Sequence, residues 1–82
     1  MDMYFVYIIE CQDGSLYTGS STNPKERFKK HKAGTGSKYT RSHRPVKLVY
    51  TEKLKTQSEA LKREIEIKNW PRSKKLNLIG AT

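Results

Sequence analysis

The chain has 82 residues, 34% of them hydrophobic and 30% charged, a balance that suits a small soluble fold and argues against disorder. We expect residues 1–82 to form one domain. Lysine and arginine number 17 against eight acidic residues, so the formal net charge is +9. An acidic polymer is therefore the first partner to consider, and nucleic acid is the commonest one.

Cysteine content and the N-terminal sequence indicate a reducing compartment. Cys11 is the only cysteine, so an internal disulfide is excluded, and no Cys/His cluster has zinc spacing. Met1-Asp2-Met3 lacks the basic and apolar regions of a signal peptide, and the apolar run that follows is too short to span a membrane. We expect a cytoplasmic monomer with no membrane partner.

Residues 4–19 are predicted to form a β-hairpin around which the rest of the chain is organised. Tyr4 to Ile9 is an unbroken apolar and aromatic run, typical of a strand buried on both faces. Asp13-Gly14 is a strong turn signal. A second short strand, residues 16–18, is expected to end at Gly19.

The length of the hairpin loop decides whether Tyr7 and Tyr17 share a face of the sheet. A two-residue loop, Asp13-Gly14, would put the two tyrosines on opposite faces. A three-residue loop that begins at Gln12, with a left-handed glycine, would put them on the same face. Both loops are common, so the sequence leaves the choice open.

The next segment carries the signals of a helix that starts at Pro24. Asn23 is the expected N-cap, and Glu26 stands where a capping box needs its acidic residue. The helix is expected to run to about Ala33 and to stop at Gly34.

Two polar residues of this helix, Arg27 and His31, fall on or beside the face that packs against the sheet. One interpretation is structural: the arginine stem covers the core, and the histidine is a satisfied residue at the core edge. The other is functional, because that face is turned towards the tyrosines of the hairpin.

Residues 34–44 show no usable period and are predicted to be a loop. They combine glycines, hydroxyls, basic residues and one aromatic ring, a mixture that can wrap a phosphodiester backbone. A merely mobile loop is the alternative. The residues expected to contact nucleic acid here are Lys38, Tyr39, Arg41 and Arg44.

After Pro45, the alternation of Val46, Leu48 and Tyr50 predicts a third strand with these three side chains on one face. No helix separates the first two strands and one helix precedes the third. A small, mostly antiparallel sheet is therefore expected.

Two further helices are predicted at the C-terminal end. Thr56-Gln57-Ser58-Glu59 is a second capping box, for a helix that ends at Lys68 or Asn69. Pro71 ends that helix and can begin another, and Trp70 is expected to help cover the sheet.

The helical wheel places Glu64 near the middle of an apolar arc. A carboxylate in such a place must be paired, hydrogen-bonded or bound to metal. A pair with Lys68, four residues later, and a functional carboxylate are alternatives that the pattern does not separate. The arc is formed by Ala60, Leu61, Ile65 and Ile67.

Together, these residues are the types that phosphodiester hydrolysis requires. Glu64 is a hard oxygen ligand that, with waters, can hold Mg²⁺ or Mn²⁺ against a phosphate. Arg27 can bind phosphate in a bidentate manner. A tyrosine, with an ordinary pKa of about 10, needs a nearby cation to act as a base. His31 can pass a proton or hold the nucleophile.

The hairpin resembles a known motif. A strand ending Phe5-Val6-Tyr7, followed ten residues later by Tyr17-Thr18-Gly19, is similar to the paired motif of GIY-YIG nucleases. Phe5 departs from the first glycine of that family.

The resemblance continues along the chain, from residue 4 to about residue 79. Arg27 follows Gly19 by eight residues, His31 follows by four more, and residues 60–68 read A-L-x-x-E-x-x-I-K. This order and spacing resemble the catalytic module of the nucleotide-excision-repair incision nuclease and the small stand-alone members of the family.

The resemblance implies an α+β fold, a three-stranded antiparallel sheet flanked by helices in the order β-β-α-β-α-α. It also implies an active site with Tyr7 and Tyr17, of which Tyr17 is the general base. Arg27 would bind the phosphate, and Glu64 would be the metal ligand. The chemistry of its side chain, rather than the resemblance, adds His31 as a further catalytic candidate.

Some positions depart from the repair nuclease: Ser20 replaces a lysine, His31 replaces a tyrosine, and its late asparagine has only Asn77 as a counterpart. Without a second domain to choose the target, we expect a structure-selective endonuclease, dependent on Mg²⁺ or Mn²⁺, that acts on DNA in repair or processing. RNA is a second candidate partner. The alternatives are a non-catalytic basic nucleic-acid-binding module with the same fold and a basic adaptor for an acidic protein or RNA. The remaining residues expected to contact nucleic acid are Ser20, Lys68, Arg72 and Lys74.

Overall fold

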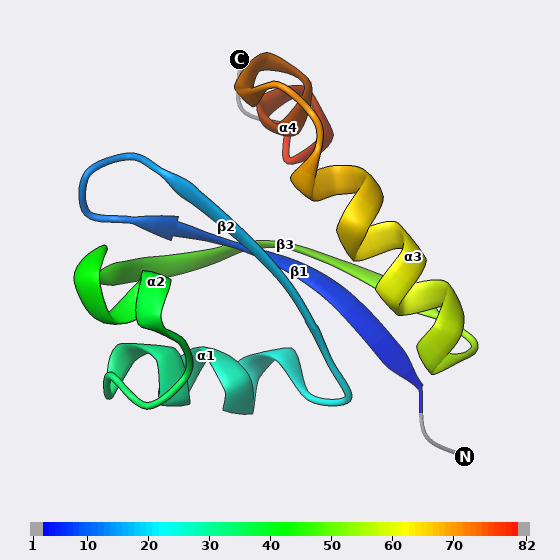
Figure 1. The fold of residues 1–82 in the computed structure, drawn as a ribbon, viewed down its shortest axis with the longest axis horizontal. Coiled ribbons are helices and arrows are strands. Elements are labelled where there is room, and N and C mark those ends of the chain that lie inside the picture. Colours follow the sequence, from blue (N-terminus) through cyan, green and yellow to red (C-terminus); the bar gives the residue numbers. More distant parts are fainter. Residues whose placement is uncertain (1–2, 81–82) are drawn as a thin grey trace.

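The computed structural model describes residues 3–80, so Met1 and Asp2 of the N-terminal stretch considered above lie outside the described residues. None of the helices within residues 3–80 combines the length and the hydrophobicity that a membrane crossing requires. The elements follow in the order β1 (Tyr4–Cys11), β2 (Leu16–Ser21), α1 (Pro24–Lys32), α2 (Lys38–Ser42), β3 (Pro45–Leu54), α3 (Gln57–Lys68) and α4 (Arg72–Leu78) (Figure 1).

The strands form one antiparallel sheet in the order β2-β1-β3, so the first strand lies in the centre. The predicted α+β class, with a three-stranded sheet flanked by helices, is confirmed. The short helix α2 is an addition to the predicted order of elements. Figure 1 shows α1 and α2 on one side of the sheet and α3 on the other.

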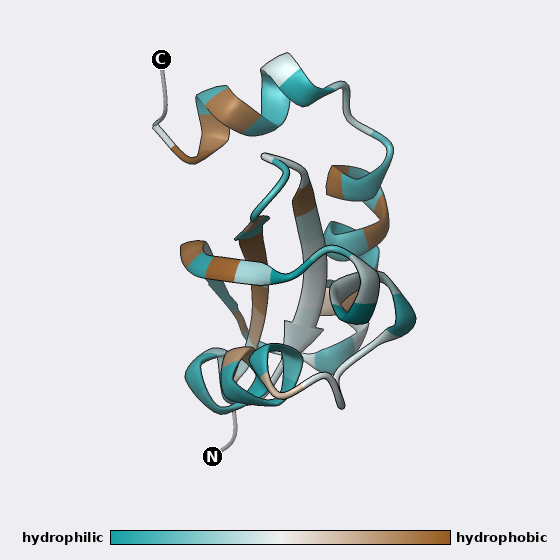
Figure 2. Cartoon of the chain, turned by 90° about the vertical axis from the view of Figure 1, so that its left-hand side faces the viewer, coloured by the Kyte–Doolittle hydropathy of each residue, from teal (hydrophilic) through white to brown (hydrophobic). Residues whose placement is uncertain are grey.

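Strand β1 is buried on both faces, as its apolar run predicted. Val6 and Ile8 point to one face and pack against α3, whereas Tyr7 and Ile9 point to the other and pack against α1. All four side chains are 0–1% exposed. The molecule therefore has two small cores, one on each side of the sheet. Helix α1, which covers one of them, is mostly hydrophilic, as Figure 2 shows at its lower edge.

Strand β2 continues to Ser21, so the prediction that it ends at Gly19 is wrong. The ladder with β1 passes through Gly19, which pairs with Tyr7, and through Ser20, which pairs with Val6, and it reaches Ser21. A glycine inside a strand often marks a place where another group approaches closely, and that is its role here. The extension also puts Ser20 on the face that packs against α3.

The N-caps predicted for the two longest helices are confirmed. The Asn23 side chain accepts a hydrogen bond from the backbone N–H of Glu26 at 3.2 Å, and the Thr56 side chain accepts one from the N–H of Glu59 at 3.1 Å. Gly34, with a φ of 82°, follows the end of α1 in the left-handed conformation that favours glycine.

Helix α3 contacts the sheet through a narrower stripe than predicted. Ala60 and Ile67 are buried as expected, and Glu64 lies between them on the same stripe. Leu61 and Ile65 are 47% and 60% exposed, so the prediction that they belong to the buried face of the helix is wrong. The residues at i, i+4 and i+7 of this stripe are enough to cover the small sheet. The residues next to them on the helix therefore face solvent.

Residues 34–44 are not all loop, because α2 forms one short helix within them. Ser37 is its N-cap and accepts a hydrogen bond from the N–H of Thr40 at 3.2 Å. A helix of five residues is too short to show a hydrophobic period, so only the cap could have indicated it.

The predicted alternation of Val46, Leu48 and Tyr50 on one face of β3 is also wrong. The adjacent residues Ile8-Ile9 of β1 pair with Tyr50 and Leu48, which leaves Val49 as an extra residue at a shift of the register. Leu48 therefore packs on the α1 side and Tyr50 on the α3 side. A β-bulge of this kind reverses the faces of all residues beyond it.

Helix α4 begins after Pro71, as predicted. The guanidinium of Arg72 donates a hydrogen bond to the carbonyl oxygen of Gly14 at 2.6 Å, which ties α4 to the hairpin loop. The Nζ of Lys74 lies 4.3 Å from the centre of the Trp70 ring. Both cations are thus held by contacts within the protein.

Candidate active site

The hairpin has the three-residue loop. The N–H of Gly14 donates to the carbonyl oxygen of Cys11 at 2.9 Å, and Gly14 has a φ of 85°. Ile9 consequently pairs with Tyr17, and Tyr7 and Tyr17 point to the same face of the sheet. Their ring centres are 6.5 Å apart. Of the two alternatives that the sequence left open, the structure selects the one that brings the tyrosines together.

The ring of Tyr7 lies across the backbone of Gly19. A Cβ atom at Gly19 would lie 2.5 Å from the Tyr7 hydroxyl oxygen and 2.6 Å from the ring carbon that bears it. Any side chain at this position would therefore displace the ring. Gly19 provides the space in which the buried Tyr7 side chain reaches across β2.

The Tyr7 hydroxyl ends in a buried hydrogen-bond chain. Its oxygen lies 2.9 Å from Nε2 of His31, and Nδ1 of His31 lies 2.7 Å from Oγ1 of Thr40. Thr40 in turn donates to the carbonyl oxygen of Ser37 at 3.3 Å. His31 and Thr40 are each 1% exposed, so this chain is closed to solvent.

The direction of these hydrogen bonds depends on the Thr40 hydroxyl proton, which has the Ser37 carbonyl, the Ser37 hydroxyl oxygen at 3.0 Å and Nδ1 of His31 within reach. We assign this proton to the Ser37 carbonyl, which can only accept, and the Thr40 oxygen then accepts the proton on Nδ1 of His31. Nε2 is then the unprotonated nitrogen and accepts the hydroxyl proton of Tyr7. His31 is thus held with its basic nitrogen towards Tyr7.

Burial keeps both partners of this hydrogen bond neutral. Burial, with a smaller contribution from the neighbouring Tyr17, raises the pKa of Tyr7 to about 12. Burial also lowers the pKa of His31, and the positive charge of Arg27 lowers it further. A phenol and an uncharged imidazole therefore face each other near neutral pH.

Arg27 is exposed on α1, one turn before His31. Its guanidinium is close enough to Tyr7 to oppose the increase in the pKa of that phenol. An exposed guanidinium beside a buried polar cluster is free to bind an anion from solvent. The structural alternative, a stem that covers the core and ends in water, also leaves the guanidinium exposed, so exposure alone does not separate the two interpretations.

Glu64 approaches the cluster from α3, at the β2 edge of the sheet. Ser20 Oγ donates a hydrogen bond to its Oε1 at 2.6 Å, and Nζ of Lys68 lies 2.8 Å from its Oε2. The Glu64 side chain is 17% exposed, so the carboxylate opens to solvent. The negative charge of Glu64 also reaches Tyr7, where it raises the pKa of the phenol.

Glu64 fits one kind of metal site only. Among residues 3–80, no group of three or more His, Cys, Asp and Glu side chains could enclose a metal ion. A single carboxylate that opens to solvent suits Mg²⁺ or Mn²⁺, which keep waters and take further oxygens from a phosphate. It does not suit zinc, which needs several nitrogen or sulfur ligands.

Helix α2 adds an aromatic stack beside Tyr17. The Tyr39 ring stacks on Tyr17 with ring centres 5.6 Å apart, and His43 stacks on Tyr39 at 4.0 Å. The loop prediction included Tyr39 as a stacking ring but not His43.

Sequence reasoning also missed Thr40, Ser37 and Gly36, which support His31. A Cβ atom at Gly36 would lie 2.1 Å from Nδ1 of His31, so the backbone here packs directly on the imidazole. The Ser-x-x-Thr pattern that caps α2 was the one available signal.

The basic residues expected to contact nucleic acid fall into two groups. Lys38, Arg41 and Arg44 are exposed in or next to α2, beside the aromatic stack. Arg72 and Lys74 of α4 are held against the hairpin loop and Trp70. The first group is the one that neighbours Tyr39, which stacks on Tyr17.

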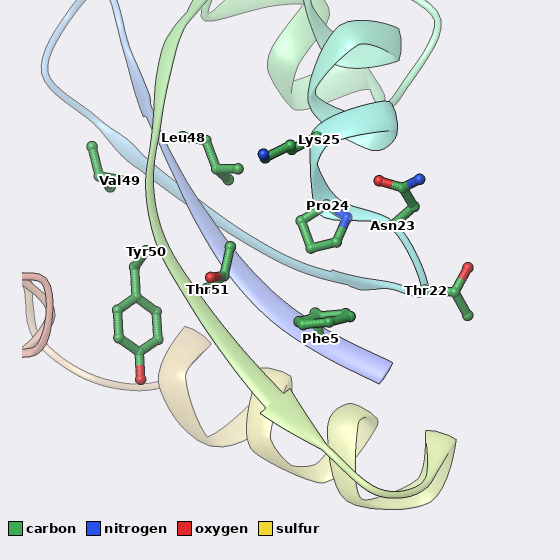
Figure 3. A pocket seen from close by; sticks show the side chains of 9 residues that line it. All are labelled: Phe5, Thr22, Asn23, Pro24, Lys25, Leu48, Val49, Tyr50 and Thr51. Carbon is green, nitrogen blue, oxygen red and sulfur yellow. The ribbon is translucent and has the colours of Figure 1, made fainter. Parts of the chain in front are cut away.

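A groove of ≈ 470 Å³ lies along β3 and the start of α1 (Figure 3). None of the five predicted catalytic residues is among those described as lining it, so it is separate from the candidate site. Its lining is formed by Phe5, Thr22, Asn23, Pro24, Lys25, Leu48, Val49, Tyr50 and Thr51.

Comparison with protein families matches residues 3–77 to the GIY-YIG catalytic domain. Curated relatives include UPF0213 proteins of Staphylococcus aureus strains N315 and MW2. Each is 58% identical to this chain over 79 residues, which is 96% of both chains.

Solved structures give the same picture. The solution NMR structure of a UPF0213 protein from Bacillus halodurans is 45% identical, with a TM-score of 0.61 over 95% of this chain and 83% of that chain. The solution NMR structure of a protein from E. faecalis is 39% identical, with a TM-score of 0.63 over 98% of this chain and 88% of that chain.

Proposed function

The chain belongs to the GIY-YIG catalytic domain family, and on that premise we propose that it is a metal-dependent endonuclease that hydrolyses DNA phosphodiester bonds. Membership of this family makes the chain a relative of nucleases. The metal, the substrate and the residue roles given below are our proposal.

One observation carries the proposal. Tyr17, Arg27 and Glu64 come from β2, α1 and α3, and each lies close enough to Tyr7 to influence the pKa of its hydroxyl. Four groups suited to phosphate chemistry therefore lie in one neighbourhood beside β2, with the rings of Tyr7 and Tyr17 6.5 Å apart. The Glu64–Lys68 ion pair that the sequence offered as the structural alternative is also present, but it does not account for the neighbouring exposed guanidinium and the two phenols.

The proposed roles follow from exposure and charge. Tyr17, which is half-buried, acts as a phenolate favoured by the neighbouring positive charge of Arg27; it accepts a proton from the attacking water and later releases it to solvent. Arg27 also binds the non-bridging phosphate oxygens. Tyr7 is buried, so its proposed role is to position other groups of the site rather than to contact solvent. It holds its hydroxyl beside the reacting groups because His31 accepts its proton in a hydrogen bond.

Glu64 is the proposed ligand of Mg²⁺ or Mn²⁺, with Ser20 orienting its carboxylate through Oε1. A divalent cation held there would supply positive charge to the phosphate and to the leaving oxygen. In the reaction the new bond joins the water oxygen to phosphorus, the bond to the leaving oxygen breaks, and solvent returns a proton to that oxygen.

DNA is the proposed partner because the surface around α2 is basic and aromatic. Lys38, Arg41 and Arg44 can contact phosphates, and Tyr39 can stack on a base. Contacts of these kinds do not read base sequence, so selectivity for DNA structure is proposed, in repair or processing.

A cleavage assay tests the proposal. Purified protein is incubated with flap, junction, nicked, single-stranded and linear duplex DNA, with and without Mg²⁺ or Mn²⁺. We expect metal-stimulated cleavage of at least one DNA and a loss of about 10²-fold or more in the Glu64→Gln and Tyr17→Phe variants.

Glu66→Gln is the matched control. Glu66 is an exposed glutamate on the same helix, and its salt bridge with Arg63 lies on the surface, so its loss should leave cleavage unchanged. Cleavage by Glu64→Gln at the wild-type rate in Mg²⁺ would refute the role of Glu64. Salt-sensitive DNA binding without metal-stimulated cleavage would favour the non-catalytic binding module instead.

A further inference from the structure

Both oxygens of the Glu64 carboxylate are already engaged within the protein. Ser20 donates to Oε1 at 2.6 Å, and the ammonium of Lys68 lies 2.8 Å from Oε2. These partners differ in one respect. The serine hydroxyl is neutral and keeps lone pairs, whereas the ammonium carries a charge and has none. Only Lys68 competes with a metal ion for the carboxylate.

The competition is steric and electrostatic. A divalent cation binds a carboxylate oxygen at about 2.0–2.6 Å. On Oε2 it would stand directly beside the Lys68 ammonium, and two neighbouring positive charges repel. Because the Glu64 side chain is only 17% exposed, water screens this repulsion weakly.

The Lys68 side chain can move from Glu64 to a second anionic partner. Its side chain is 46% exposed on the last turn of α3, and its Nζ lies 5.8 Å from the centre of the Tyr17 ring. An anionic phosphate that docks at Tyr17 and Arg27 would therefore lie within reach of a flexible ammonium.

We infer that Lys68 is an exchangeable internal cation, which occupies the place of the divalent ion at Glu64 while DNA is absent and moves to a substrate phosphate when DNA binds. The inference rests on the proposed function, because it assigns Glu64 to the metal. It makes metal binding and DNA binding mutually dependent, so that each increases the affinity for the other by the same factor.

This exchange serves two purposes in one site. Without the metal, Lys68 neutralises a carboxylate that would otherwise repel the DNA backbone. When DNA is bound, the Lys68 ammonium pairs with a phosphate instead, and the Glu64 carboxylate can then bind the metal. The divalent ion is then held firmly only when a phosphate is present beside it.

The test measures metal binding without cleavage. Mn²⁺ is titrated into the DNA-free protein, and the free ion is followed by electron paramagnetic resonance. We expect Lys68→Met to bind Mn²⁺ more tightly than the wild type by about tenfold, a typical size for such coupling. Lys68→Arg keeps the charge and should bind as weakly as the wild type. Glu64→Gln should lose the site.

Lys62→Met is the control for net charge. Lys62 is exposed on the same helix, two residues before Glu64 and therefore on the opposite side of α3. Its variant should match the wild type. If Lys68→Met binds Mn²⁺ no more tightly than Lys62→Met, or if neither binds measurably, the inference is overturned.

A second titration includes DNA, in the Tyr17→Phe background so that the oligonucleotide stays intact. DNA should raise the Mn²⁺ affinity of the protein with Lys68 by about tenfold and that of Lys68→Met much less. Equal gains would also overturn the inference. Tighter Mn²⁺ binding by Lys68→Met together with no cleavage of any DNA would support the exchange and reject the proposed nuclease activity.

Discussion

Tyr7 and Gly19 are directly paired across β1 and β2, and the tyrosine ring lies over the glycine backbone. The strand pairing brings the two residues opposite each other, and the missing side chain lets the ring cross the edge strand. The position of the Tyr7 hydroxyl, and with it the hydrogen bond to His31, depends on this one contact.

Replacing Gly19 with alanine should therefore disturb both stability and activity. The new Cβ would lie 2.5 Å from the Tyr7 hydroxyl, so the ring must move. We expect a loss of about 1–3 kcal/mol in the free energy of unfolding. Displacement of catalytic geometry by about 1 Å can cost 10²-fold in rate. Urea unfolding and the cleavage assay measure the two effects.

A double variant separates this clash from other effects. In a Tyr7→Leu background the ring is absent, so Gly19→Ala should cost much less stability than it does in the wild type. Additive losses in the two backgrounds would show that the ring contact is not the cause.

Thr40→Val tests the far end of the buried chain. Valine keeps the shape of threonine but leaves Nδ1–H of His31 without an acceptor. We expect the free energy of unfolding to fall by about 1–3 kcal/mol, because a buried donor loses its partner. Cleavage should also slow, since His31 is then free to turn its basic nitrogen away from Tyr7.

Thr40→Ser is the matched control, because it retains the hydroxyl and loses one methyl group. It should remain much closer to the wild type in both stability and rate. Equal effects of the serine and valine variants would contradict a role for the hydroxyl. Thermal unfolding and initial cleavage rates, measured on all three proteins, provide the comparison.

The stability of the protein should fall in strongly alkaline solution because of Tyr7. Burial raises the pKa of this residue from 10.0 to about 12. Between these values the unfolded chain loses the Tyr7 proton while the folded protein retains it, so increasing pH favours unfolding. Below pH 10 the contribution is fully present, and it is lost as the pH rises towards about 12.

Tyr7→Phe cannot lose this proton, so it provides the reference. The free energy of unfolding of the wild type, minus that of Tyr7→Phe, should decrease across this alkaline window. Urea unfolding at a series of pH values measures the difference and cancels the titration of the lysines. If the free energy of unfolding changed with pH in the same way for both proteins, the raised pKa of Tyr7 would be contradicted.

Substitution of Arg41 and Arg44 by glutamine should weaken DNA binding without changing its sequence preference. Both residues are exposed beside α2, where they can neutralise phosphates. Each lost phosphate contact should lower the dependence of log K on log salt by about 0.9 for duplex DNA. Fluorescence anisotropy at several salt concentrations measures this slope.

Lys53→Gln is the control for that experiment. Lys53 is exposed on β3, where it pairs with Phe5 of the central strand. An unchanged slope in the Arg41/Arg44 variant, or an equal decrease in the Lys53 variant, would mean that α2 is not the DNA-binding surface.

Local chemistry explains what could be predicted from residues alone. The caps at Asn23 and Thr56 join atoms only three residues apart in the chain, so their patterns identified both helices. The paired tyrosines, Arg27 and Glu64 were recognisable in the same way, because motif spacing is a property of the sequence.

Predictions failed where the outcome depends on packing. Leu61 seemed part of the apolar arc, but the small sheet accepts only one ridge of α3. The alternation in β3 is interrupted by the bulge at Val49, and no pattern in the sequence predicted that bulge. Helix α2 was too short for periodicity to reveal it.

The sequence by itself determined the class of fold, the starts of the two longest helices and the set of residues proposed for phosphate chemistry. Tertiary structure alone decided which hairpin loop forms, that Gly19 makes room for Tyr7, and that Ser20 donates a hydrogen bond to Glu64. The physical reason is distance along the chain. Capping and turn chemistry act between near neighbours, whereas Tyr7–His31 and Ser20–Glu64 join residues 24 and 44 positions apart, which meet only after the sheet and helices have packed.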